Sequence, residues 1–139
     1  MKLFAKVLAV AALLLLAPNP SFALWGIAPV SLERAKQLGM EVRSHAAGPT
    51  DVRVDVELKL EGELKNFKEV NLRISDGDKL LATAPLREDR SSPGRVVVSF
   101  TADRMKLEKL TLWVMVPGTL GGTVYTLRVK DFVDLEKAR

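Results

Sequence analysis

Residues 51–61 (DVRVDVELKLE) constrain the fold of this chain most, because apolar and charged side chains alternate along them without interruption. Successive side chains of a β-strand point to opposite faces, so a period of two indicates a strand with one buried and one solvated face. The charged positions belong to the solvated face. We expect the apolar positions to lie in the core: Val52, Val54, Val56, Leu58 and Leu60.

Six further segments have strand patterns and are bounded by turn signals. Between two of them, Asp76-Gly77-Asp78 indicates a hairpin turn, since glycine adopts a positive φ at no steric cost. Residues 102–109 are predicted to form a helical turn or an irregular crossing, with Met105 and Leu107 directed towards the core. The six predicted strands are residues 40–44, 69–75, 79–84, 95–101, 110–116 and 123–131.

One helix is predicted, at residues 31–39 (SLERAKQLG). Ser31 is a favourable N-cap, Glu33 lies in the first turn, and Gly39 suits the left-handed position that ends a helix. Val30, just before the cap, is expected to pack on Ala35.

Seven strands joined by loops, with no helices between them, predict an all-β domain in which two antiparallel sheets pack face to face. In strand number and spacing this arrangement resembles immunoglobulin-like and fibronectin-III-like sandwiches. The chain lacks the cysteine pair, the core tryptophan and the corner tyrosine of antibody domains, so no functional residue is carried over. A small β-barrel is the alternative, because alternation does not determine whether the sheet closes.

Residues 1–23 have the form of a secretory signal peptide. Two lysines give a basic start, residues 7–17 are an uninterrupted apolar run, and residues 21–23 (SFA) suit cleavage after Ala23. Cleavage after Ala28 is a weaker alternative. A permanent membrane anchor is also weaker, because a spanning helix needs roughly 20 apolar residues.

Removal of the signal would leave 116 residues, 139 less 23, which suits one domain. We divide it into an N-terminal segment with the helix and first strand, residues 24–45, and the rest of the β-sandwich, residues 46–139. Lys2 and Lys6 would leave with the signal, so 19 basic and 17 acidic side chains would remain, a formal net charge of +2. These charges are interleaved, so we expect no nucleic-acid partner.

The chain contains no cysteine. We therefore expect a domain held together by its core without disulfides, and no lipid attached through a cysteine at the cleavage site. The export signal is bacterial in style. We expect a secreted protein that is soluble in a periplasm or outside the cell and leaves the membrane once the signal is removed.

The sequence offers no catalytic motif. His45, the only histidine, is predicted to lie in a solvated loop rather than to activate a nucleophile. Glu57 with Glu61, or Glu61 with Glu63, would be paired carboxylates on a wet strand face, where solvent surrounds both groups and a catalytic role is not expected. We predict neither catalytic nor cofactor-binding residues.

The sequence also offers no metal or phosphate motif. Asp76-Gly77-Asp78 lacks the continuation of a calcium loop, and one histidine without cysteines makes a zinc or copper site improbable. The glycines of residues 117–122 are not followed by the lysine and helix of a phosphate loop. We predict no metal site and no cofactor.

One surface is a candidate for binding a partner. If residues 117–122 close a hairpin with Val116 opposite Thr123, Leu112 faces Leu127 and Val114 faces Tyr125 on the core side. The opposite face then gathers Thr111 and the candidate patch Trp113, Met115, Val124, Thr126 and Arg128. The alternative is that residues 24–30 or the helix cover this face.

These observations predict an exported, non-catalytic β-sandwich module that binds another envelope or extracellular component, either a protein or a polysaccharide. The alternative is a small secreted hydrolase whose site is assembled from loops and leaves no linear motif. The sequence leaves the oligomeric state open.

Overall fold

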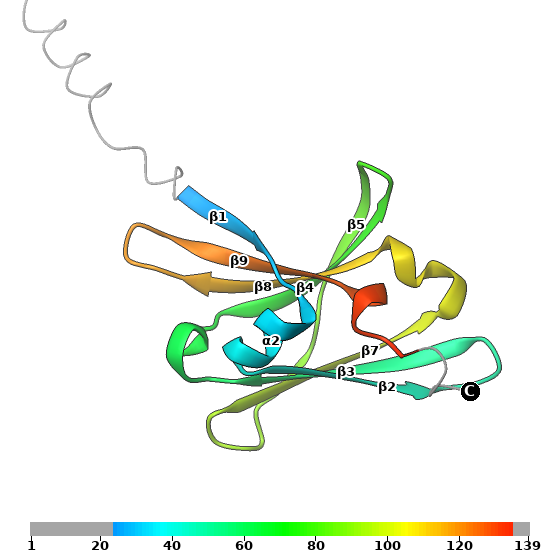
Figure 1. The fold of residues 1–139 in the computed structure, drawn as a ribbon, viewed down its shortest axis with the longest axis horizontal. Coiled ribbons are helices and arrows are strands. Elements are labelled where there is room, and N and C mark those ends of the chain that lie inside the picture. The colour runs from blue at the N-terminus through cyan, green and yellow to red at the C-terminus, as the bar shows by residue number, and fades with distance from the viewer. Residues whose placement is uncertain (1–23, 135–139) are drawn as a thin grey trace, which may run out of the picture.

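The alternating segment forms strand β3 (Asp51–Lys59), in the interior of one of two β-sheets in a computed structural model of the chain (Figure 1). The structure describes residues 24–134. The inward positions Val52, Val54, Val56 and Leu58 are fully buried, as predicted. Leu60 lies beyond the end of the strand and is only half-buried.

The described residues contain nine strands divided between a five-stranded and a four-stranded sheet. The two-sheet, all-β prediction is therefore confirmed, and the closed barrel is not observed. In the four-stranded sheet the order is β2 (Met40–Ala46), β3, β7 (Arg95–Asp103) and β6 (Glu88–Asp89). In the five-stranded sheet the order is β1 (Leu24–Pro29), β9 (Gly121–Arg128), β8 (Leu110–Pro117), β4 (Glu69–Asp76) and β5 (Lys79–Pro85).

Two strands were not predicted from the sequence. Strand β1 lacks alternation, and it pairs in parallel with β9, so the expectation of purely antiparallel sheets is wrong at this edge. Strand β6 has two residues and lies between the predicted strands at residues 79–84 and 95–101. Strand β2 is longer than predicted and includes His45, which was expected in a loop.

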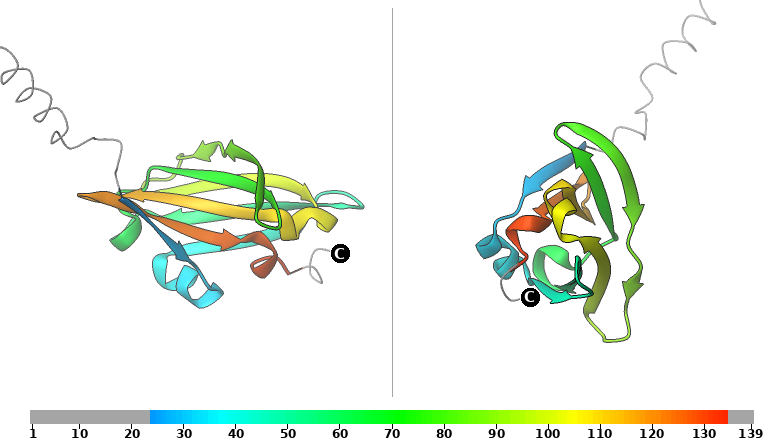
Figure 2. Two further views of the ribbon diagram at one scale, coloured as in Figure 1. Left: turned by 90° about the horizontal axis from the view of Figure 1, so that it is seen from above. Right: turned by 90° about the vertical axis from the view of Figure 1, so that its right-hand side faces the viewer.

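Helix α2 (Leu32–Leu38) closes the side of the sandwich where β1 and β2 are the edge strands (Figures 1 and 2). Its caps are those predicted: the hydroxyl of Ser31 accepts a hydrogen bond from the amide of Arg34, and Gly39 has a φ of 82°. Ala35 and Leu38 are buried in the core together with Val30. The helix therefore packs on the inner side of the sheets.

Three 3₁₀ turns complete the core: η1 (Gly62–Leu64), η2 (Arg104–Lys109) and η3 (Val129–Asp131). Each contributes one buried side chain, namely Leu64, Leu107 and Val129. The prediction for η2 is half right, because Leu107 is buried whereas Met105 is 83% exposed. Within residues 24–134, no helix has the length and apolarity needed to cross a bilayer.

Both edges of the five-stranded sheet have a proline at a position that points away from the sheet. The amide of Val30 donates to the carbonyl of Thr126, so even-numbered positions of β1 face β9 and Pro29 faces outward. The amide of Leu86 donates to the carbonyl of Val70, which likewise turns Pro85 of β5 outward. Proline has no amide hydrogen, so it weakens an edge as a template for another strand.

A hydrogen-bonded network joins α2 to the sheets. Arg34 Nη2, on the helix, donates to both carboxylate oxygens of Glu63, at 2.8 and 2.9 Å. The hydroxyl of Tyr125 donates to the same carboxylate at 2.5 Å. Burial, with the adjacent Glu63 carboxylate, raises the pKa of Tyr125 to about 12. The hydrogen bonds from Tyr125 and Arg34 hold the pKa of Glu63 below its ordinary value.

Tyr125 is the only tyrosine in the chain, so its ionisation can be followed by phenolate absorbance. We predict a midpoint near pH 12 in the folded protein, against roughly 10 when it is unfolded in urea. The raised pKa contributes stability that is complete below the unfolded value and is lost as pH rises through the folded one. Glu63→Gln should lower the folded midpoint. A folded midpoint near the unfolded value would contradict the network.

Candidate functional site

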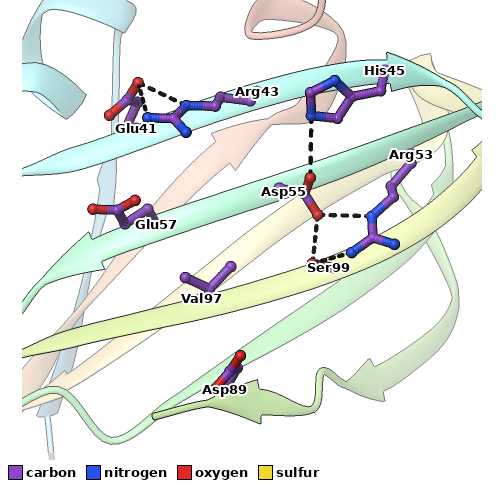
Figure 3. Close-up of a pocket in the computed structure, with 9 residues that line it drawn as sticks. All are labelled: Glu41, Arg43, His45, Arg53, Asp55, Glu57, Asp89, Val97 and Ser99. Carbon is purple, nitrogen blue, oxygen red and sulfur yellow. Dashed lines mark hydrogen bonds and ion pairs between the residues drawn. The ribbon is translucent and has the colours of Figure 1, made fainter. Parts of the chain in front are cut away.

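A polar groove of about 320 Å³ lies on the outer face of the four-stranded sheet (Figure 3). Its side chains come from the four adjacent strands of this sheet. The alternation of β3 directs the charged side chains of that strand outward, into the groove. The lining residues are Glu41, Arg43, His45, Arg53, Asp55, Glu57, Asp89, Val97 and Ser99.

Asp55 is the centre of the interactions in this groove. The hydroxyl of Ser99 donates to Asp55 Oδ1 at 2.5 Å, and Arg53 Nε donates to the same oxygen at 3.0 Å. His45 Nε2 lies 3.3 Å from Asp55 Oδ2. Partial burial acts to raise the pKa of Asp55, but the hydrogen bonds from Ser99 and Arg53 outweigh it and hold the pKa below its ordinary value.

The structure thus brings a serine, an aspartate and a histidine together, which the sequence did not predict. Their order differs from that of a catalytic triad, in which the histidine lies between the serine and the acid. Here Asp55 lies between Ser99 and His45, so the serine contacts a carboxylate of lowered pKa, which is a weak base. The geometry is that of a hydrogen-bonded ion cluster.

Two of the other acidic residues considered from the sequence also have basic partners. Glu57 pairs with Arg95 at 3.2 Å, and Glu63 belongs to the network with Arg34. The segment Asp76-Gly77-Asp78 forms the predicted turn between β4 and β5, and Gly77 has a φ of 58°. Among residues 24–134, no three His, Cys, Asp or Glu side chains are grouped to hold a metal ion.

The hairpin of β8 and β9 has the register predicted from the sequence. Val116 is opposite Thr123, Leu112 is opposite Leu127, and Val114 is opposite Tyr125. The predicted patch is therefore on the outer face of the five-stranded sheet. There Val124 is 3% exposed, Trp113, Met115 and Thr126 are half-buried, and Arg128 is exposed and paired with Asp131 at 2.7 Å.

Four residues of this face, Trp25, Ile27, Asn71 and Arg73, were not predicted to lie on it. The guanidinium of Arg73 lies 3.7 Å from the ring centre of Trp113, and Asn71 Nδ2 lies 3.6 Å from Met115 Sδ. The indole of Trp25 in β1 lies close against Gly122, where an added Cβ would meet the ring at 2.4 Å. The alternation of residues 69–75 could have placed Asn71 and Arg73 on the outer face of the sheet. No pattern in the sequence indicated the position of Trp25.

Neither segment expected to cover the patch lies across it as a separate layer, although Val124 within the patch is only 3% exposed. Residues 24–29 form β1, which lies beside β9 in the same sheet, and Ile27 there is 61% exposed. Helix α2 buries Ala35 and Leu38 in the core, on the opposite side of β9, whereas its Leu32 is 51% exposed. We call this surface the tryptophan face; it comprises Trp25, Ile27, Asn71, Arg73, Trp113, Met115, Val124 and Thr126.

The Asp55 cluster predicts a pH-dependent contribution to stability. Because the folded pKa of Asp55 is lowered, its contribution is present above the unfolded value of about 3.9 and is lost as pH falls through the folded value. Urea unfolding should therefore show Asp55→Asn to be less stable than the wild type near pH 7, with the gap narrowing towards about pH 3. Asp78→Asn, in the exposed turn, is the matched control. A gap independent of pH would contradict the assignment.

Comparison of the chain with known protein families, with curated proteins and with solved structures finds no match.

Proposed function

We propose that the protein is an exported, non-catalytic module that binds a protein of the cell envelope or the extracellular space through its tryptophan face. The observation that carries this proposal is the row of apolar side chains across β1, β9 and β8, on a sheet face over which the described residues place no helix. Isolated apolar residues are normal on a surface, but a contiguous patch of this kind favours an interaction site.

The composition of the face favours a protein partner over a polysaccharide. Tryptophan, methionine and arginine are enriched in protein interfaces, where tryptophan and arginine often carry most of the binding energy. The guanidinium of Arg73 already lies against one ring face of Trp113. A sugar ring could not use that ring face without displacing it, whereas a protein surface can pack around the stacked pair.

The export part of the proposal rests on residues 1–23, which lie outside the described residues. Cleavage after Ala23 would leave strand β1 (Leu24–Pro29) whole. Cleavage after Ala28 would instead remove five of the six residues that pair with β9, including Trp25 and Ile27. The pairing therefore favours the earlier cleavage point.

We also infer an immunoglobulin-like type of sandwich, and the strand order supports it. In such sandwiches strands A, B, E and D form one sheet, and C, F and G form the other. The order β2, β3, β7, β6 corresponds to the first set, and β4, β8, β9, with β5 added beside β4, corresponds to the second. Strand β1 is an addition before this series. An experimental structure with another strand order would contradict the inference.

Binding is tested by capture from an envelope extract of the native cells on immobilised mature protein. The same protein should be captured by the wild type and by Leu120→Asp, a control that adds the same charge at an exposed turn residue. Ile27→Asp and Arg73→Ala should weaken its binding about tenfold or more, measured by titration. Equal binding by all four proteins would contradict the proposed face. A captured ligand that resists protease but not glycosidase would replace the protein with a polysaccharide.

Export is tested by N-terminal sequencing of the protein made in its own cells. We predict a mature chain that starts at Leu24 and is recovered in the soluble periplasmic or extracellular fraction. Met1 retained in a membrane fraction would contradict both cleavage and release.

A further inference from the structure

Strand β2 differs from the other edge strands of the two sheets. Strands β1 and β5 have the outward prolines Pro29 and Pro85, and β6 has only two residues. Strand β2 spans Met40–Ala46 without a proline, and β3 is its only hydrogen-bonded neighbour among the described strands. It is therefore the one long edge within residues 24–134 that lacks these protections against pairing with another strand.

The direction of its free backbone groups follows from two hydrogen bonds. The amide of Lys59 donates to the carbonyl of Gly39, and the amide of Ala47 donates to that of Asp51, each at 2.9 Å. These bonds turn the odd-numbered positions of β2 towards β3. Alternate residues of a strand direct their N–H and C=O to opposite sides, so the outward groups are those of the even-numbered positions. They are Met40, Val42, Ser44 and Ala46.

The side chains of β2 determine which partner fits this edge. Glu41 and Arg43 lie on the solvated face of the strand, more than half exposed, and pair with each other at 2.9 Å (Figure 3). Glu57, also acidic, is opposite Glu41 in β3, and Asp55 opposite Arg43 is already bound by Arg53 and Ser99. An acidic and a basic residue two positions apart complement the same pair on an antiparallel copy of the strand.

We propose that β2 pairs antiparallel with β2 of a second copy of this chain, about a two-fold axis at Val42. In this register Met40 faces Ser44 of the second copy, and Val42 faces its own equivalent, so three of the four outward positions form backbone hydrogen bonds. Glu41 of each copy then faces Arg43 of the other copy, which gives two pairs of opposite charge. The two four-stranded sheets join into one sheet of eight strands.

Charge selects this register over its neighbours. Outward groups can pair only with outward groups, so the register shifts in steps that keep even positions opposite even positions. The two neighbouring registers have the two-fold axis at Arg43 or at Glu41. The first places Arg43 opposite Arg43 of the second copy, and the other places Glu41 opposite Glu41. Like charges directly opposite each other are unfavourable, whereas the register centred on Val42 has two attractive pairs. Val42, which is half-buried, also gains a covering contact.

The test is sedimentation of the mature protein over a range of concentrations, with variants that change the charge pattern. The wild type should show a monomer–dimer equilibrium. Glu41→Arg and Arg43→Glu should each raise the dissociation constant about tenfold or more, because each places like charges opposite each other at both pairs. The double variant, Glu41→Arg with Arg43→Glu, should restore the wild-type value. Lys106→Glu, an exposed charge reversal on η2, should leave it unchanged.

An equimolar mixture of the two single variants separates pairing between chains from effects within one chain. Every pair in the mixed dimer is attractive, so the mixture should associate although neither variant associates alone. Val42→Pro removes an outward amide that β3 does not use, and it should abolish the dimer while circular dichroism shows a folded β-protein. A wild type that stays monomeric overturns the proposal. So does a mixture that stays monomeric while the wild type forms dimers.

Discussion

The packing of β3 against the opposite sheet is the interaction on which the rest of the structure depends. Its four inward side chains are fully buried, and it is hydrogen-bonded on both sides, to β2 and β7. With no cysteine in the chain, no covalent link joins the two sheets. The apolar contacts between the sheets must therefore supply the net stability, a margin that in single domains is usually about 5–15 kcal/mol.

The same alternation that builds the core also determines the polar groove. Each inward valine of β3 requires an outward neighbour, and those neighbours include Arg53, Asp55 and Glu57. Because their positions are set by the pleat, β2 and β7 can place His45 and Ser99 beside Asp55 with little adjustment. Such a cluster therefore arises as a consequence of sheet register. Its geometry has to be examined before a serine, an aspartate and a histidine are taken to indicate catalysis.

The sequence predicts most of the fold where a pattern is local. The alternation of β3, the caps Ser31 and Gly39, and the hairpin register of β8 and β9 all depend on neighbouring residues, and all are confirmed. Strand β1 was not predicted, because its partner is far along the chain and its own residues do not alternate. The candidate patch was placed on the correct face for the same local reason, whereas Trp25 and Arg73 join it only through pairing between strands.

The parallel pairing of β1 with β9 has a kinetic consequence. Leu24 pairs with Gly121, so the first strand finds its partner 97 residues later (121 less 24). Contacts between distant segments form slowly, because a long loop must close before they contribute any stability. In a chain that emerges amino terminus first, this segment therefore has no pairing partner until the last hairpin has been made. The first strand of the fold would then be among the last to find its partner.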